Sequence, residues 1–74
     1  MDEKEFKALF SNFCDEYNLD GKILRNYFEA MKMNDTMSLE IYSMLLFNDC
    51  PKELFDEMKK ELKELVKHYK DFST

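Results

Sequence analysis

One ten-residue stretch constrains this chain more than any other. It reads SLEIYSMLLF over residues 38–47, and seven of its ten side chains are apolar or aromatic. A segment that leaves almost no polar face must be buried, either inside its own fold or against another protein. Leu, Met and Glu favour a helix here, although the alternation of apolar residues also fits a strand. We expect a short helix over 38–47 that forms the centre of the core.

The remaining apolar residues predict three more helices. They recur at the spacing of one helical face over three segments, 3–17, 23–31 and about 51–72. Asp2 and Asp20 stand where they would cap the first two helices, and Thr36 or Ser38 where they would cap the third. A single Gly and a single Pro disfavour an all-β fold with its many tight turns. The chain therefore predicts one all-α domain over residues 1–74, compact and four-helical, with a long C-terminal helix.

The predicted C-terminal helix carries an apolar stripe with lysines along one border and glutamates along the other. The stripe fits a bundle helix with solvated flanks, which we favour, and it also fits a dimer seam between two copies. A dimer seam would use Leu62, Leu65, Val66 and Tyr69. Two copies would then align in parallel, because that alignment sets each lysine border against a glutamate border.

Charge is distributed unevenly along the chain. Residues 1–51 contain ten acids and five bases, a net of −5, whereas residues 52–74 contain six of each, and 33–51 hold no Lys or Arg. An acidic surface repels phosphate backbones, so direct nucleic-acid binding is disfavoured and a protein partner with a basic surface is favoured. Ordinary solubility also explains a net charge of this size. The candidate contact residues are Asp2, Glu3, Glu5, Asp15, Glu16, Asp20, Asp35, Glu40 and Asp49.

The sequence carries no pattern typical of catalysis, of a metal site or of a cofactor site. Cys14, Cys50 and His68 are the only soft ligands or nucleophile and base candidates, and no Cys pair has zinc-type spacing. We therefore expect free thiols, no enzymatic activity and no cofactor. The N-terminal MDEKEF is acidic where a signal peptide needs basic and apolar residues, and no apolar run reaches membrane-spanning length. These features predict a cytoplasmic protein.

One acidic connection resembles part of an EF-hand calcium loop. The residues that carry this resemblance are Glu16, Asn18, Asp20, Gly21 and Ile23. The pattern departs at Tyr27, where calcium binding needs a bidentate Glu. A degenerate EF-hand-like module is therefore one alternative, and a helix connection with Gly at a turn is the favoured interpretation.

Residues 43–47, SMLLF, resemble the bacterial sliding-clamp-binding peptide, whose pattern is Gln-Leu-x-Leu-Phe. Leu46 and Phe47 match the pattern, Met44 replaces a leucine, and Ser43 stands at the glutamine position. Such peptides bind in extended form. Because this segment is predicted to be helical, core packing is the favoured interpretation of these residues.

The whole chain also resembles a class of proteins in length and composition. It is very short and acidic, and it is rich in Phe, Tyr, Asn, Lys and Met. In this it is similar to small bacteriophage proteins that disable host machinery, among them DNA mimics and sliding-clamp inhibitors. The resemblance implies a non-enzymatic inhibitor that blocks a basic, DNA-handling host protein, for which the sliding clamp is a candidate. A homo-oligomeric assembly adaptor is the alternative from another functional class.

Overall fold

Helices make up almost all of the computed structural model, which describes residues 2–73. The elements are α1 (Glu3–Tyr17), α2 (Gly21–Lys32), α3 (Thr36–Asp49), the 3₁₀ turn η1 (Lys52–Leu54) and α4 (Phe55–Ser73). No strand occurs within residues 2–73. The predicted all-α fold with a long C-terminal helix is confirmed, except that η1 forms the start of the segment predicted as one continuous last helix.

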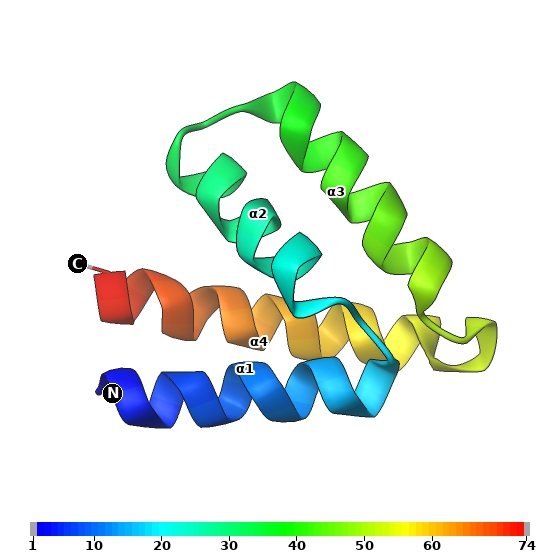
Figure 1. The fold of residues 1–74 in the computed structure, drawn as a ribbon, viewed down its shortest axis with the longest axis horizontal. Helices are drawn as coiled ribbons and strands as arrows, with labels where there is room; N and C mark the ends of the chain where they lie inside the picture. Colours follow the sequence, from blue (N-terminus) through cyan, green and yellow to red (C-terminus); the bar gives the residue numbers. More distant parts are fainter. Residues whose placement is uncertain (1, 74) are drawn as a thin grey trace.

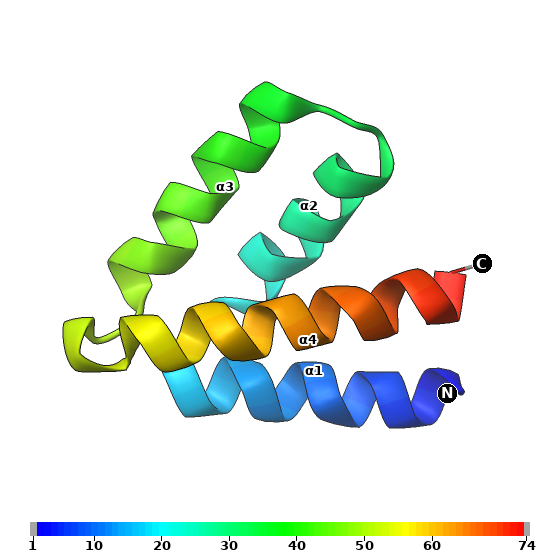
Figure 2. The ribbon, with the colours of Figure 1, turned by 180° about the vertical axis from the view of Figure 1, so that it is seen from behind.

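The four helices form two antiparallel pairs (Figure 1). In one pair α1 and α4 lie side by side, which brings the two chain termini to the same end of the molecule. In the other pair α2 and α3 form a hairpin that stands over α1 and α4, as the reverse view also shows (Figure 2). The molecule measures 32 × 26 × 19 Å. In this arrangement α3 lies at the edge, with α2 as its main neighbour.

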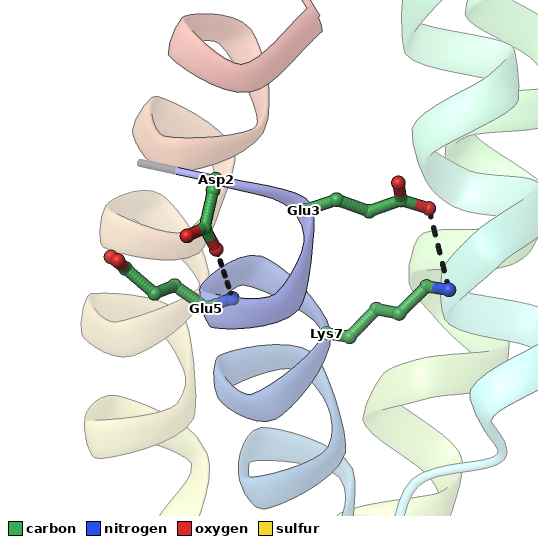
Figure 3. Close-up of polar contacts among 4 residues, drawn as sticks. All are labelled: Asp2, Glu3, Glu5 and Lys7. Carbon is green, nitrogen blue, oxygen red and sulfur yellow. Dashed lines mark hydrogen bonds and ion pairs between the residues drawn. The ribbon is translucent and has the colours of Figure 1, made fainter.

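Aspartates cap the first three helices. The Asp2 carboxylate accepts a hydrogen bond of 2.8 Å from the backbone N–H of Glu5 (Figure 3), and Asp20 accepts one of 2.8 Å from Lys22. Both caps were predicted and are confirmed. The prediction of Thr36 or Ser38 as the third cap is wrong, because Asp35 caps α3 instead. A carboxylate has two oxygens, and Asp35 uses both: it accepts from the Ser38 backbone N–H at 3.1 Å and from the Ser38 hydroxyl at 2.7 Å.

We expect Asp35→Ala to lower the melting temperature at pH 7, and Asp35→Asn to lower it less, because Asn retains a capping oxygen. The hydrogen bonds from Ser38 hold the pKa of Asp35 below its usual value. The ionised carboxylate therefore stabilises the fold at pH values above its unfolded-state pKa. The stabilisation disappears as the pH falls through its folded-state pKa. Calorimetry between neutral and strongly acidic pH measures the effect. Equal losses for the two variants at pH 7 would contradict the capping role.

Asparagines make the reversals between helices. Asn18 follows α1 and Asn34 lies between α2 and α3, and each has a left-handed backbone with φ of 56°. Asn tolerates this conformation better than most residues. The prediction that Gly21 provides the turn is wrong, since Gly21 is the first residue of α2 and its φ is not positive. A Cβ at Gly21 would lie 3.6 Å from the Phe10 ring, which is an ordinary contact.

The core lies between the two helix pairs and includes Phe28 of α2. Its ring stacks on Tyr69 of α4 with the centroids 4.7 Å apart, and it also meets Phe6 and Phe10 of α1 with centroids at 6.2 Å. Phe28 thus links three helices. The largest fully buried side chains in the described chain are Tyr17, Leu24, Leu46 and Met58.

The prediction that residues 38–47 form the centre of the core is wrong. Leu46 is the only buried residue of α3, at 1% exposure, while Met37, Ile41 and Met44 are exposed by 76%, 53% and 67%. The reason is that α3 lies at the edge of the molecule. A helix at the edge of the molecule has neighbours on one side, so an apolar residue on its other side remains in solvent whatever its hydrophobicity.

The apolar stripe of α4 is covered within the chain. Leu62 and Leu65 are buried in the core, and Val66 and Tyr69 are partly buried against it. The α1 helix packs along α4 and occupies the surface that a second copy would need. The bundle interpretation of this stripe is therefore correct, and the proposed dimer seam through these four residues is not.

Candidate partner-binding surfaces

The nine predicted acidic contact residues are all exposed, but they do not form a single patch. Asp2, Glu3 and Glu5 lie at the first turn of α1, whereas Asp15 and Glu16 lie in its last turn. The two groups are separated by about 20 Å at the α-helical rise of 1.5 Å per residue. A partner that contacts one end of α1 therefore need not contact the other.

Four of these nine carboxylates cap a helix or form an ion pair within the chain. Asp2, Asp20 and Asp35 cap helices, and Glu3 forms an ion pair with Lys7 at 3.3 Å (Figure 3). An exposed ion pair of this kind stabilises a helix only slightly, so Glu3 remains able to exchange partners. The three caps, in contrast, also have a structural role that must be separated from any binding role.

The structure brings one predicted acid together with two that were not predicted. Glu16 of α1 faces Glu61 and Glu57 of α4, and we call these three residues the acidic cluster. Partial loss of solvent together with the charges of Glu61 and Glu57 raises the pKa of Glu16 above its usual value. Glu16, Glu61 and Glu64 also line a groove of about 270 Å³ between α1 and α4. No Lys or Arg is among the described residues that line this groove.

Glu57 and Glu61 were missed because residues 52–74 have no net charge. The signal was nevertheless present in the helical pattern, which places the glutamates of the last helix along one border of its apolar stripe. That border faces the end of α1 that carries Glu16. Predicting the contact would have required knowing that α1 and α4 pack together in antiparallel orientation.

We expect Glu16→Gln to raise the melting temperature at pH 7. Because the folded-state pKa of Glu16 is raised, the protonated side chain stabilises the fold relative to the ionised one. This stabilisation is fully present at pH values below the unfolded-state pKa and is lost as the pH rises through the folded-state pKa. Glutamine removes the repulsion that ionisation brings. Thermal unfolding at pH 7 and again in strong acid measures the effect, and the gain should disappear in acid. A loss of stability at pH 7 would contradict the like-charge contact.

Tyr17 lies beneath the acidic cluster. Its side chain is fully buried, and its hydroxyl group lies beside the carboxylates of Glu61 and Glu16. Burial, together with the nearby charges of Glu61 and Glu16, raises the pKa of Tyr17 above its usual value. The phenol therefore stays neutral, and the negative charge of this region comes from carboxylates.

A second surface consists of exposed apolar side chains on and beside α3. We call it the outer face, and its members are Met33, Met37, Ile41, Met44 and Leu45. They account for five of the seven exposed large hydrophobic residues in the described part of the chain. A contiguous apolar patch on a small protein is typical of an interaction site.

The clamp-like pentapeptide does not form an accessible motif. Residues 43–47 are helical, Leu46 is buried, and Phe47 packs against Phe55 with ring centroids 5.4 Å apart. Only Met44 among the three motif residues faces solvent. An extended ligand would need Leu46 and Phe47 free, so the clamp-motif assignment is wrong. Core packing is the correct interpretation for Leu46 and Phe47 but not for Met44, which is exposed.

The lysine border of α4 faces a groove on the other side of that helix. Lys59, Lys63 and Lys67 line this groove of about 510 Å³ together with Tyr27 and Phe47. The ammonium of Lys59 lies 5.6 Å from the centroid of the Phe47 ring, within range of a cation–π contact. From the sequence, these lysines could be interpreted only as a solvated flank of the last helix. The two aromatic residues of the groove come from α2 and α3, so only the fold brings them next to the lysines.

The described residues give no support to metal binding. Cys14 and Cys50 are free and buried, and burial is the main cause that raises both thiol pKa values. Asn18 and Asp20 of the EF-hand-like segment terminate α1 and cap α2. Within residues 2–73 no three His, Cys, Asp or Glu side chains are placed to hold a metal ion.

The acidic cluster and the outer face are therefore the two surfaces with a chemistry suited to protein partners. Neither contains a paired nucleophile and base, and both are formed by helices that the core holds in place. Among the described residues, no helix has the length and apolarity needed to span a bilayer. In comparisons with known proteins, the chain matches no family model, no curated protein and no solved structure.

Proposed function

We propose that this protein acts by binding rather than by catalysis, and that its acidic cluster occupies a basic, DNA-handling surface of another protein. One observation carries the proposal: Glu16 of α1 and Glu61 of α4 line the same groove, Glu57 adds its charge next to Glu16, and no Lys or Arg among residues 2–73 lines that groove. Like charges held this close repel. A cationic partner would relieve that repulsion, which makes its binding more favourable.

DNA-binding sites are suitable targets because they concentrate Lys and Arg to neutralise phosphates. Carboxylates displayed on rigid helices can take the place of those phosphates, and Asp15 and Asp20 lie near Cys14 at the same end of α1. The protein would then act as an inhibitor in the cytoplasm, in the manner of the small bacteriophage proteins that it resembles. The sliding clamp is one candidate target, reached through charge and not through residues 43–47.

Competition with DNA tests the proposal. A fluorescent duplex bound to a bacterial sliding clamp, and to a panel of other bacterial DNA-binding proteins, is titrated with this protein, with displacement of the duplex as the readout. We expect displacement from at least one of them, with affinity that falls steeply between about 50 mM and about 500 mM salt. The triple variant Glu16→Gln, Glu57→Gln, Glu61→Gln should bind at least about tenfold more weakly.

A matched control separates the acidic cluster from overall charge. Glu5→Gln, Glu29→Gln, Glu53→Gln removes three carboxylates as well, but from α1, α2 and η1 outside the cluster. It should keep its affinity within about twofold, since distant substitutions act independently. Absence of displacement throughout the panel, salt-insensitive displacement, or equal losses in the two triple variants would each overturn the proposal.

A further inference from the structure

The outer face of α3 lacks the cover that such an apolar surface normally has. Successive members of the face follow one another by three or four residues, from Met37 to Ile41 and Met44, so they form one stripe along the helix. Met37 and Met44 are each more than two-thirds exposed. Leaving this much apolar surface in water is unfavourable by roughly 25 cal/mol per Å². An occupant that covers the stripe would recover this free energy.

The charge around the stripe indicates what kind of occupant fits. Glu40 lies three residues after Met37 and four before Met44, so its carboxylate is adjacent to the middle of the stripe. Asp49 follows Leu45 by four residues, and Asp35 caps the start of the helix. Every ionisable side chain of α3 and of its cap that carries a charge at neutral pH is therefore acidic.

The same charges argue against a second copy of this chain. In an antiparallel pairing of two α3 helices centred on Ile41, like borders of the stripe meet, so the two Glu40 carboxylates come close together. In a parallel pairing the Glu40 border of one copy meets the border that carries Asp49 in the other, and both borders are acidic. Both arrangements set like charges together, and residues 33–51 contain no Lys or Arg to compensate.

The lysines of α4 lie beside one border of the stripe. They reach α3 through the groove that Ser43 and Phe47 line. Ser43 and Phe47 lie two residues before and two residues after Leu45, which places them on the opposite side of the helix from it. Ser43 and Phe47 follow Glu40 and Met44 by three residues each, so the lysine groove adjoins this border of the stripe and lies opposite Leu45.

We infer that the outer face of α3 binds a basic amphipathic helix of a partner protein. The partner's apolar residues, spaced by three and four positions, pack on Met37, Ile41 and Met44, and its lysines or arginines reach Glu40 and Asp49. Methionine suits this role because its unbranched, polarisable side chain adapts to different apolar surfaces. The inference shares with the proposed function only the expectation that the partner is basic. The outer face and the acidic cluster are different surfaces.

Methionine methyl resonances report directly on this surface. The probe is a designed helical peptide of about 18 residues, with leucines at helical spacing and lysines elsewhere, titrated into methyl-¹³C-methionine protein. We expect the signals of Met37 and Met44 to shift, whereas that of Met58, which is fully buried in the core, stays in place. A peptide with the same leucines and glutamates in place of lysines should bind at least about tenfold more weakly.

Two variants separate this inference from the proposed function. Glu40→Lys changes one exposed residue in the middle of the stripe and should weaken the lysine peptide at least about tenfold while strengthening the glutamate peptide. The triple variant Glu16→Gln, Glu57→Gln, Glu61→Gln should bind the lysine peptide within about twofold of the wild type. Circular dichroism verifies that each variant is folded. The peptide assay can therefore succeed where the DNA competition fails, and the reverse also holds.

Three results would overturn the inference. The first is equal affinity for the two peptides, which would remove the role of charge. The second is binding that leaves the Met37 and Met44 signals unchanged, which would place the contact elsewhere. The third is concentration-dependent broadening of those signals without peptide, accompanied by a dimer in sedimentation, which would assign the face to a second copy.

Discussion

Phe28→Ala is expected to destabilise the fold by about 3–5 kcal/mol, enough to unfold most of the protein at 37 °C. Phe28 is 2% exposed and its ring contacts side chains of both α1 and α4, including Phe6 at 6.2 Å and Tyr69 at 4.7 Å. Truncation removes the group that holds the α2–α3 hairpin on the α1–α4 pair. A domain of this length has little stability in reserve, so the loss is decisive. Urea unfolding followed by circular dichroism measures it.

Phe72→Ala is the matched control for this prediction. Phe72 also contacts Phe6, with the rings stacked at 5.4 Å, but it is 38% exposed near the end of α4. Its truncation should lower the free energy of unfolding by only about 1 kcal/mol, because the site can relax into solvent. A loss as large as that of Phe28→Ala would contradict this role of Phe28.

The second large effect distinguishes two adjacent leucines of α3. Leu46→Ala should lower the free energy of unfolding by about 2–5 kcal/mol, whereas Leu45→Ala should lower it by less than about 1 kcal/mol. Leu46 is 1% exposed and Leu45 is 39% exposed. The two substitutions change helix propensity equally, so the difference between them isolates the effect of burial. Similar losses would mean that α3 is covered on both sides, which would leave no free outer face.

Much of the fold follows from local sequence patterns. The recurrence of Phe6, Phe10 and Phe13 with Leu9 marks α1 over the same residues that the structure gives it. Asp2 and Asp20 could be identified as caps because capping depends on residues three or fewer positions away. Predictions that rest on neighbours in the chain were therefore accurate for these two helices.

The position of α3 could not be obtained in this way. Periodicity identifies the face that a helix prefers to bury, but a helix with apolar residues around its whole circumference has no preferred face. Which side is covered depends on where the helix lies relative to α2, and that is a property of the whole fold. The assignment of residues 38–47 to the centre of the core failed for this reason.

The candidate site was partly accessible to sequence reasoning. Glu16 and Glu40 could be listed as acidic contact candidates from composition alone, and both are exposed. The contact of Glu16 with Glu57 and Glu61 could not, because it joins helices that are about 40 residues apart in the chain. Net charge per segment also concealed it, since the lysines of α4 balance its glutamates while facing a different groove.

Methionine oxidation tests the central claim, that α3 buries one side and leaves its methionine-bearing side open to a partner. The folded protein is treated with hydrogen peroxide, and peptide mass spectrometry follows sulfoxide formation at each methionine. Met37 and Met44 should oxidise almost as fast as in the urea-unfolded chain, whereas Met58 should react only on unfolding. Protection of Met37 and Met44 to the same degree as Met58 would contradict the account, because the outer face would then be covered.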